Sequence, residues 1–353
     1  MGQARVGHDK ARYQADCDAL IVAIHQSTWR TDQLCLTSSS PDRHGPDRHG
    51  ACRGRPHEWQ PGNGIAAMAA VANRAYHRRV ISHDLHALGF DAPDLDSLVN
   101  SAAQAGAVGV EDVGGFDLLA AYTDPSGARL AMLSRDGEMD TMASLVAPTT
   151  HAAEVRRYRP TVALVELVEG GSPLSQLAVS GASGGVHGKR VARFLANADD
   201  PVEYPLCAEP GDDTSAFVQH LRIGAVANGF IRVHDSEEAY GASEEGGFGP
   251  RSDVQFSAGH LISPWLMELE AGRASRAEVS AVAEMTMVVD QCEKRTNELT
   301  GEQWWRCMGK VGFPLTLALP AGLPTDPHPG SVLSGQVVPV ISSGTWEGDA
   351  LWS

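Results

Sequence analysis

The chain lacks any run of about 18 consecutive apolar residues, so no segment is long enough to cross a membrane as a helix. Its N-terminus also lacks the apolar stretch of a secretory signal peptide. The six cysteines include no C-x-x-C pair, and an even number in so long a chain does not predict a disulfide framework. We therefore expect a soluble, cytoplasmic protein with reduced thiols.

Positive charge is also scarce, since 28 Lys and Arg stand against 44 Asp and Glu, for a formal net charge of −16. Residues 1–62 carry a net charge of +1, so the other 291 residues carry −17. Such an acidic body repels both nucleic-acid phosphates and anionic membrane surfaces. The charge argues against nucleic-acid and membrane partners, and we expect the partner to be a protein.

The composition divides the chain into three parts. Residues 1–62 are a low-complexity segment in which Pro41-Asp-Arg-His-Gly45 is repeated at once by the next five residues, and we predict a disordered extension there. Residues 63–170 are predicted to form a domain of helices followed by a β-meander. Residues 171–353 are predicted to be a β-rich domain with a barrel-like C-terminal part.

Apolar residues at helical spacing predict helices over 65–79, 82–88 and 94–105, the last with Asp94 as its N-cap and Gly106 as its end. The period then changes from 3.6 to 2, which predicts strands over 116–123, 128–134 and 139–147. Asp124-Pro-Ser-Gly127 suits the turn between the first two strands. A further strand is expected over 161–169. The predicted fold class is α+β.

The second half reads mostly as β. Residues 189–196 are ambiguous between helix and strand, residues 216–233 are mainly apolar, and Ser263 followed by Pro264 predicts the start of a short helix. Alternating apolar residues predict strands over 279–289, 303–310, 314–320 and 336–341. Glycines that interrupt these strands suggest bending around a small barrel, and an oligonucleotide-binding-type barrel is one candidate topology.

The glycine-rich segment Gly181-Ala-Ser-Gly-Gly-Val-His-Gly-Lys189 leaves several interpretations open. Gly181-Ala-Ser183-Gly-Gly185 has the G-x-S-x-G form of a serine nucleophile elbow. As a phosphate-binding P-loop it departs from the motif at Ser183 and at Arg190. The plainest interpretation is a flexible loop between two strands.

The same segment, taken from Leu177 to Phe194, resembles the glycine loop of short-chain dehydrogenases. In that family the glycines let backbone amides approach a dinucleotide pyrophosphate at the start of a helix. His187 stands here at the position of the third glycine. The resemblance implies an NAD(P)-dependent oxidoreductase as one alternative function, with a serine hydrolase as the other enzymatic alternative.

No complete catalytic or metal-binding constellation emerges from the sequence, so we predict neither a cofactor nor a metal. His83 and His86 have metal-compatible spacing on a predicted helix, but no carboxylate pair at helical spacing completes the site.

Five of the seven tryptophans lie in the last 89 residues, and tryptophan is enriched at binding hot spots. The sequence therefore predicts a non-catalytic binding or assembly protein that uses an aromatic C-terminal surface, with Trp304, Trp305 and Trp265 as binding residues. A single-stranded nucleic-acid-binding barrel is the remaining alternative.

Overall fold

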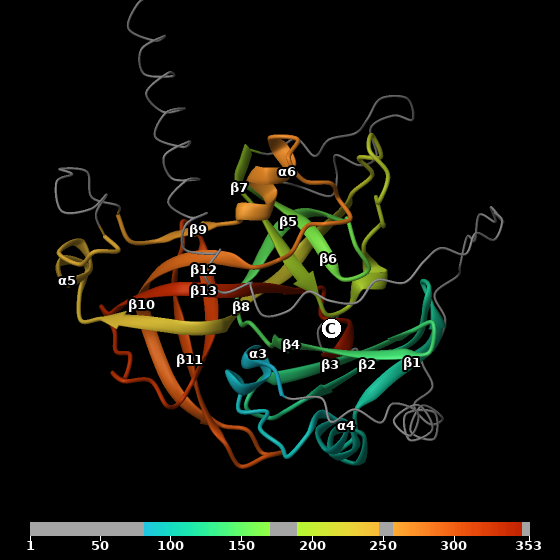
Figure 1. Ribbon diagram of the computed structural model, residues 1–353, viewed down its shortest axis with the longest axis horizontal. Coiled ribbons are helices and arrows are strands. Elements are labelled where there is room, and N and C mark those ends of the chain that lie inside the picture. Colours follow the sequence, from blue (N-terminus) through green and yellow to red (C-terminus); the bar gives the residue numbers. More distant parts are fainter. Residues whose placement is uncertain (1–80, 170–188, 247–256, 348–353) are drawn as a thin grey trace, which may run out of the picture. The chain divides into compact units, whose positions relative to one another are not determined.

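The computed structural model describes residues 81–169, 189–246 and 257–347. The described part of the chain is mostly β, with few and short helices (Figure 1). Its elements, in chain order, are α3 (His83–His86), α4 (Leu95–Gln104), β1 (Val108–Val113), β2 (Phe116–Thr123), β3 (Ala128–Arg135), β4 (Glu138–Leu145), β5 (Thr150–Arg157), β6 (Val162–Glu169), β7 (Lys189–Ala198), a 3-10 turn (Pro201–Glu203), β8 (Ala216–His234), α5 (Glu237–Gly241), β9 (His260–Ile262), α6 (Pro264–Glu270), β10 (Ala283–Thr296), β11 (Gln303–Lys310), β12 (Pro314–Pro320) and β13 (Val332–Ser342). No helix in these ranges is long and apolar enough to span a membrane.

Local sequence signals account for the helices. The Asp94 side chain accepts a hydrogen bond from Ser97 N at 2.8 Å and so caps α4 as predicted. The helix predicted over 82–88 is present as α3. Helix α6 begins at Pro264, but Ser263 Oγ accepts from Leu195 N of β7 rather than capping its own helix. The helix predicted over 65–79 lies outside the described residues.

The antiparallel meander predicted over 116–147 is confirmed. It is extended by β1, which the sequence analysis missed, into a four-stranded sheet in the order β1-β2-β3-β4. The turn between β2 and β3 is closed by Gly127 N donating to Asp124 O at 2.8 Å. The Asp124 carboxylate also accepts from Glu298 N at 2.9 Å, so this turn is tied to the hairpin loop between β10 and β11.

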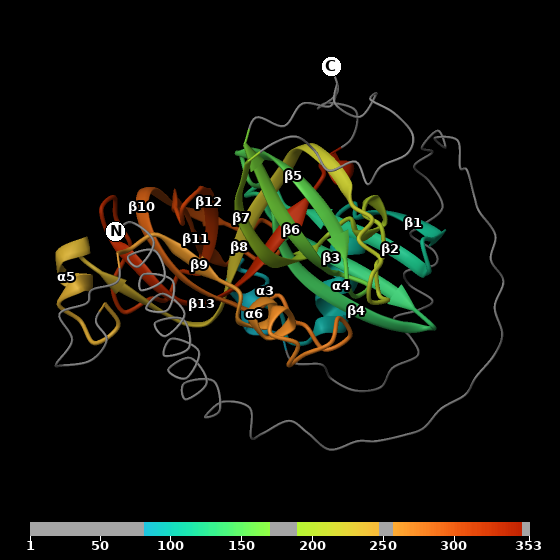
Figure 2. The ribbon, with the colours of Figure 1, turned by 90° about the horizontal axis from the view of Figure 1, so that it is seen from above.

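The remaining strands form one nine-stranded mixed sheet whose pairings close two rings (Figure 2). Ring A contains β8, β5, β6, β7 and β13, and ring B contains β8, β13, β10, β11 and β12. The two rings share the β8–β13 pair. Ring B includes the C-terminal strands in which a small barrel was expected, but its closure requires β8, which lies far earlier in the chain.

This sheet runs across residue 170, where the sequence analysis placed a domain boundary. Strands β5 and β6 precede that boundary, yet they pair with β8 and β7, which follow it. Strand β8, at 19 residues, is long enough to take part in both rings. The segment 189–196, ambiguous in sequence, is the strand β7.

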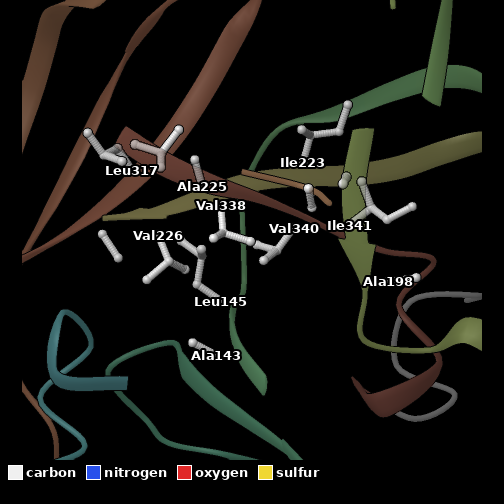
Figure 3. Close-up of a cluster of buried hydrophobic side chains, with 14 of the residues drawn as sticks. Ala143, Leu145, Ala198, Ile223, Ala225, Val226, Leu317, Val338, Val340 and Ile341 are labelled. Carbon is white, nitrogen blue, oxygen red and sulfur yellow. The ribbon is translucent and has the colours of Figure 1, made fainter. Parts of the chain in front are cut away.

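The four-stranded sheet packs on the strands shared by the two rings. Ala143 and Leu145 of β4 lie beside Val226 of β8 and Val338 of β13 (Figure 3). At Gly224 of β8 an added Cβ would come within 2.6 Å of Leu145 Cδ2. A larger residue at position 224 would therefore displace the Leu145 side chain from this contact.

A buried ionic network crosses the same contact. The fully buried Arg129 of β3 donates to Asp199 Oδ2 at 2.7 Å, to Ser342 Oγ at 3.1 Å and to Glu347 Oε1 at 2.8 Å. Arg222 of β8 also meets Glu347, at 2.7 Å. The network joins β3 to β8, to the end of β13 and to the segment after β7.

Asp200, next to Asp199, holds the segment that follows β13. Its carboxylate accepts from Ser343 N at 2.6 Å and from Tyr204 Oη at 2.9 Å. Burial, reinforced by repulsion from Asp199, raises the pKa of Asp200 to about 7. Trp346 Nε1 donates to the Asp199 carbonyl at 2.9 Å, so several bonds fix this segment.

Replacing Arg129 by leucine should destabilise the protein by about 3–5 kcal/mol, because the buried Asp199 would lose its cation and Glu347 would keep only Arg222. Chemical denaturation measures this change. Arg135→Ala is the matched control on the same strand, since the Arg135 side chain is half exposed and should contribute less than about 1 kcal/mol. Equal effects of the two substitutions would contradict the role of the network.

The pKa of Asp200 predicts a dependence of stability on pH. Because the folded-state pKa lies above the ordinary value of 3.8, the folded protein binds the extra proton, and this stabilisation is lost as pH rises from about 4 to about 7. Asp200→Asn removes the titration, so the variant should gain on the wild type by up to about 1.4 kcal/mol per pH unit across that window. Urea unfolding of both proteins at pH 5 and pH 8 measures the difference, and an unchanged difference would refute the assignment.

Candidate functional site

The three predicted binding tryptophans lie in different environments. Trp304 has no exposed surface, and its Nε1 donates to Ser126 Oγ at 3.2 Å. It therefore has no surface to offer a partner in this fold. Trp305, on the other face of β11, is half-buried under Lys294, whose ammonium lies 4.6 Å from the ring centroid. Trp265 on α6 is 38% exposed. The structure does not bring the three together into one aromatic surface.

Most of the glycine-rich segment 181–189 lies outside the described residues, but its flanks are informative. Strand β6 precedes it and β7 follows it, and these two strands pair antiparallel. A dinucleotide loop or a nucleophile elbow needs a helix directly after the glycines. Residues 189–198 form a strand instead, which favours the interpretation of a loop between two strands.

The histidines with metal-compatible spacing do not assemble a site. His83 and His86 lie on the four-residue helix α3, and His86 Nδ1 is 3.7 Å from Asp91 Oδ2. Within 81–169, 189–246 and 257–347 no group of three or more His, Cys, Asp or Glu side chains is arranged to hold a metal ion.

A dense set of polar side chains lies on the outer face of ring B. Four neighbouring strands each contribute one polar residue at a paired position. These residues are Arg232 of β8, Ser334 of β13, Thr286 of β10 and His260 of β9. Residues paired in this way project from the same face of a sheet. The alternate row, which includes the fully buried Leu333 and Met287, faces the ring interior. The polar row therefore faces away from the interior of ring B. We call this side of ring B the outer face.

Glu245, which follows α5, covers part of this face. Its Oε2 accepts from Ser334 Oγ at 2.5 Å and lies 3.2 Å from His234 Nε2, while its Oε1 meets Arg232 at 2.6 Å. Tyr240 of α5 packs edge-on against the His234 ring, with the centroids 5.3 Å apart. The α5 segment is held to the sheet by this carboxylate and this ring.

The trio of Ser334, His234 and Glu245 contains the residue types of a serine hydrolase but not the arrangement. In a catalytic triad one histidine nitrogen faces the serine and the other faces the acid. Here the same nitrogen, Nε2, faces both Ser334 and Glu245, and the serine donates directly to the carboxylate. The trio is arranged as a clasp for the α5 segment rather than as a proton relay.

Two further groups of the outer face have perturbed acidities. Burial raises the pKa of Glu284, with Glu245 adding to the shift, although Gln336 Nε2 donates to it at 2.9 Å. Burial lowers the pKa of His260, whose Nδ1 lies 2.9 Å from Thr286 Oγ1. Both shifts favour the neutral form of the side chain.

Beside the clasp, a bulge projects Phe230 into solvent. Strand β8 has three residues, 228–230, where β13 has only one, between the pairs Ile231↔Gly335 and Ala227↔Val337. The bulge depends on Gly335, whose φ is +147° and where an added Cβ would lie 2.6 Å from Phe230 O. Phe230 is 66% exposed, and the guanidinium of Arg232 lies 5.9 Å from its ring centroid. Bulges of this kind re-aim side chains next to functional sites.

Phe230 and Arg232 were not among the binding residues expected from the sequence. They lie in the mainly apolar stretch 216–233, in which an exposed aromatic residue carries no distinguishing mark. The Asn228-Gly229 dipeptide was the available signal, since it is typical of a break in a strand. Glu245 could not have been assigned from sequence, because its partners Arg232 and Ser334 lie 13 residues before it and 89 residues after it.

Comparisons with protein families, with curated proteins and with solved structures found no match.

Replacing Glu245 by glutamine should loosen the α5 segment, because a neutral amide weakens the charge-assisted bonds to Arg232 and Ser334. Amide hydrogen exchange over residues 237–246 should become faster while exchange in β5 and β6 stays unchanged. Glu244→Gln is the matched control, since the neighbouring Glu244 is exposed. Equal protection in the two variants would show that Glu245 does not hold the segment.

Proposed function

We propose that this is a binding or assembly protein whose partner is another protein, docked on the outer face of ring B around Phe230 and Arg232. The exposure of Phe230 on a bulge is the observation that carries the proposal. Covering a solvent-exposed phenylalanine with a partner removes apolar surface from water, which contributes favourable free energy to binding. An aromatic ring beside an arginine is also the composition that dominates binding energy at protein interfaces.

The charge around Phe230 indicates the chemistry of the partner. The segment 235–245 directly follows β8 and contains no Lys or Arg, and the ion pair between Arg232 and Glu245 joins it to the bulge. Its exposed acidic residues are Asp235, Glu237, Glu238 and Glu244. An acidic rim around an apolar anchor complements a surface with Lys or Arg around an apolar pocket. It repels nucleic-acid phosphates, so a protein fits better than a nucleic acid.

This proposal keeps the class of function expected from the sequence but moves its anchor from the tryptophans to Phe230. Trp265 and Trp305 stay as predicted secondary contacts. The cytoplasm stays the proposed location, on the expectation from the sequence that the thiols are reduced.

Peptide selection against the full-length chain tests the proposal, because a random library offers binders of every charge and hydrophobicity. A phage-displayed library should yield peptides that combine Lys or Arg with an apolar residue. Their affinities for the wild type and its variants can be measured by fluorescence anisotropy. Phe230→Ala should weaken binding about tenfold or more, as expected of a central anchor. Glu237→Gln combined with Glu238→Gln should weaken binding mainly at low salt.

Val191→Ala and Leu206→Ala are the controls, because these side chains are 50% and 47% exposed, have no aromatic ring, and lie on β7 and between β7 and β8. Neither should change the affinity. Peptides that bind the Phe230→Ala variant as tightly as the wild type, or an enriched set that is acidic, would overturn the proposal.

A further inference from the structure

Two of the free cysteines lie directly opposite each other inside ring B. Cys292 of β10 and Cys307 of β11 are paired in the antiparallel register of the two strands. Both are free thiols, Cys307 fully buried and Cys292 partly exposed. Cys207 is the third free cysteine of the described residues, and among these residues no cysteine lies opposite it in a strand pair.

The backbone hydrogen bonds place this pair at the closer of the two kinds of cross-strand position. Asn297 N donates to Glu302 O at 2.8 Å, which makes Asn297 and Glu302 a hydrogen-bonded pair. The register continues without a bulge from this pair back to Cys292, and the two kinds of pair alternate. Counting five positions from Asn297 makes Cys292 and Cys307 a non-hydrogen-bonded pair.

The spacing of such a pair suits a disulfide. The Cα atoms of a non-hydrogen-bonded antiparallel pair lie about 4.5 Å apart, and disulfides occur with Cα separations of roughly 4.4–6.8 Å. Opposed positions also direct both Cβ atoms to the same face of the sheet. The register therefore places the two residues within the range of backbone separations at which disulfides form.

We propose that Cys292 and Cys307 form a reversible redox site, a cross-strand disulfide made by exchange with a low-molecular-mass disulfide. The Cys292 thiolate attacks one sulfur of the small disulfide, which forms a mixed disulfide and releases one small thiolate. The Cys307 thiolate then attacks the Cys292 sulfur, closes the protein disulfide and releases the second small thiolate. The two protein thiols are oxidised, the small disulfide is reduced to two thiols, and the two protein protons go to those products.

Exposure sets the order of these steps. Cys292 is the accessible thiol, and its Sγ donates to Pro327 O at 3.1 Å, so the loop before β13 covers it in part. Burial, with a contribution from Asp326, raises the pKa of Cys292, and burial raises that of Cys307 further. Since the thiolate is the attacking species, oxidation should be slow near neutral pH and faster in alkaline solution.

The disulfide would form beside the Lys294–Trp305 contact, two residues along both strands. Closing it removes the Cys292 thiol proton and with it the bond to Pro327 O. The expected consequences are a change in Trp305 emission and a looser loop at Asp326 and Pro327.

Mass spectrometry of the full-length protein tests the site directly. The chain is equilibrated with oxidised glutathione at pH 8.5, alkylated and digested with trypsin. Cleavage after Arg276, Lys294, Arg306 and Lys310 places the two cysteines on separate fragments, 277–294 and 307–310. We expect these fragments to be recovered as one disulfide-linked species, about 2 Da lighter than their sum. Dithiothreitol should separate them again.

Variants distinguish this pair from other thiols. Cys292→Ala should abolish the linked species, while Cys207→Ala should leave it unchanged. The sequence also contains Cys17, Cys35 and Cys52. A triple Cys→Ser variant at these positions should still form the link. Glutathione recovered only as a mixed disulfide on Cys292, or Cys292 linked to a cysteine other than Cys307, would overturn the proposal.

Discussion

The contact between the two sheets depends on the buried guanidinium of Arg129. A single side chain from the meander reaches Asp199, Ser342 and Glu347, which belong to segments 70–218 residues away along the chain. A buried charge tolerates little displacement, because each lost partner leaves an uncompensated charge at low dielectric. The network therefore adds directional bonds between β3 and the strands β8 and β13, next to the apolar contact of Leu145 on β4.

The fixed position of β8 and β13 determines what the rest of the molecule can present. Both strands belong to both rings, so the side chains that face the ring interiors are covered. Only the outward-facing residues of β8 and β13 can contact a partner. Within its pairing with β13, the C-terminal half of β8 runs along ring B and bulges at Phe230. The ion pair between Glu245 and Arg232 then holds an acidic segment near the Phe230 side chain. The aromatic anchor and its charged rim thus both follow from the extra length of one strand.

The residues of the candidate site differed in how far sequence could identify them. Tryptophan content pointed to Trp304, but a side chain's hydrophobicity does not tell whether it packs inside or projects outward, and Trp304 lies in the core. Phe230 was hidden in an apolar stretch because its exposure comes from an extra residue in the pairing with β13. The opposition of Cys292 and Cys307 was equally hidden, because a slip of one residue in the register would move the two sulfurs to opposite faces.

The amino-acid sequence by itself determined the local elements. Asp94 caps α4, and the turn at Asp124 and Gly127 closes the meander. Alternating apolar residues predicted β11 and β12 in full, but β10 and β13 only in part. These signals act over a few residues, where backbone geometry and side-chain period are sufficient. Only the tertiary structure decided that β5 and β6 join the later strands, that β8 serves two rings and that Glu245 meets Ser334. Such pairings join segments far apart in sequence, and their free energy comes from burial and hydrogen bonds that exist only once the chain has folded.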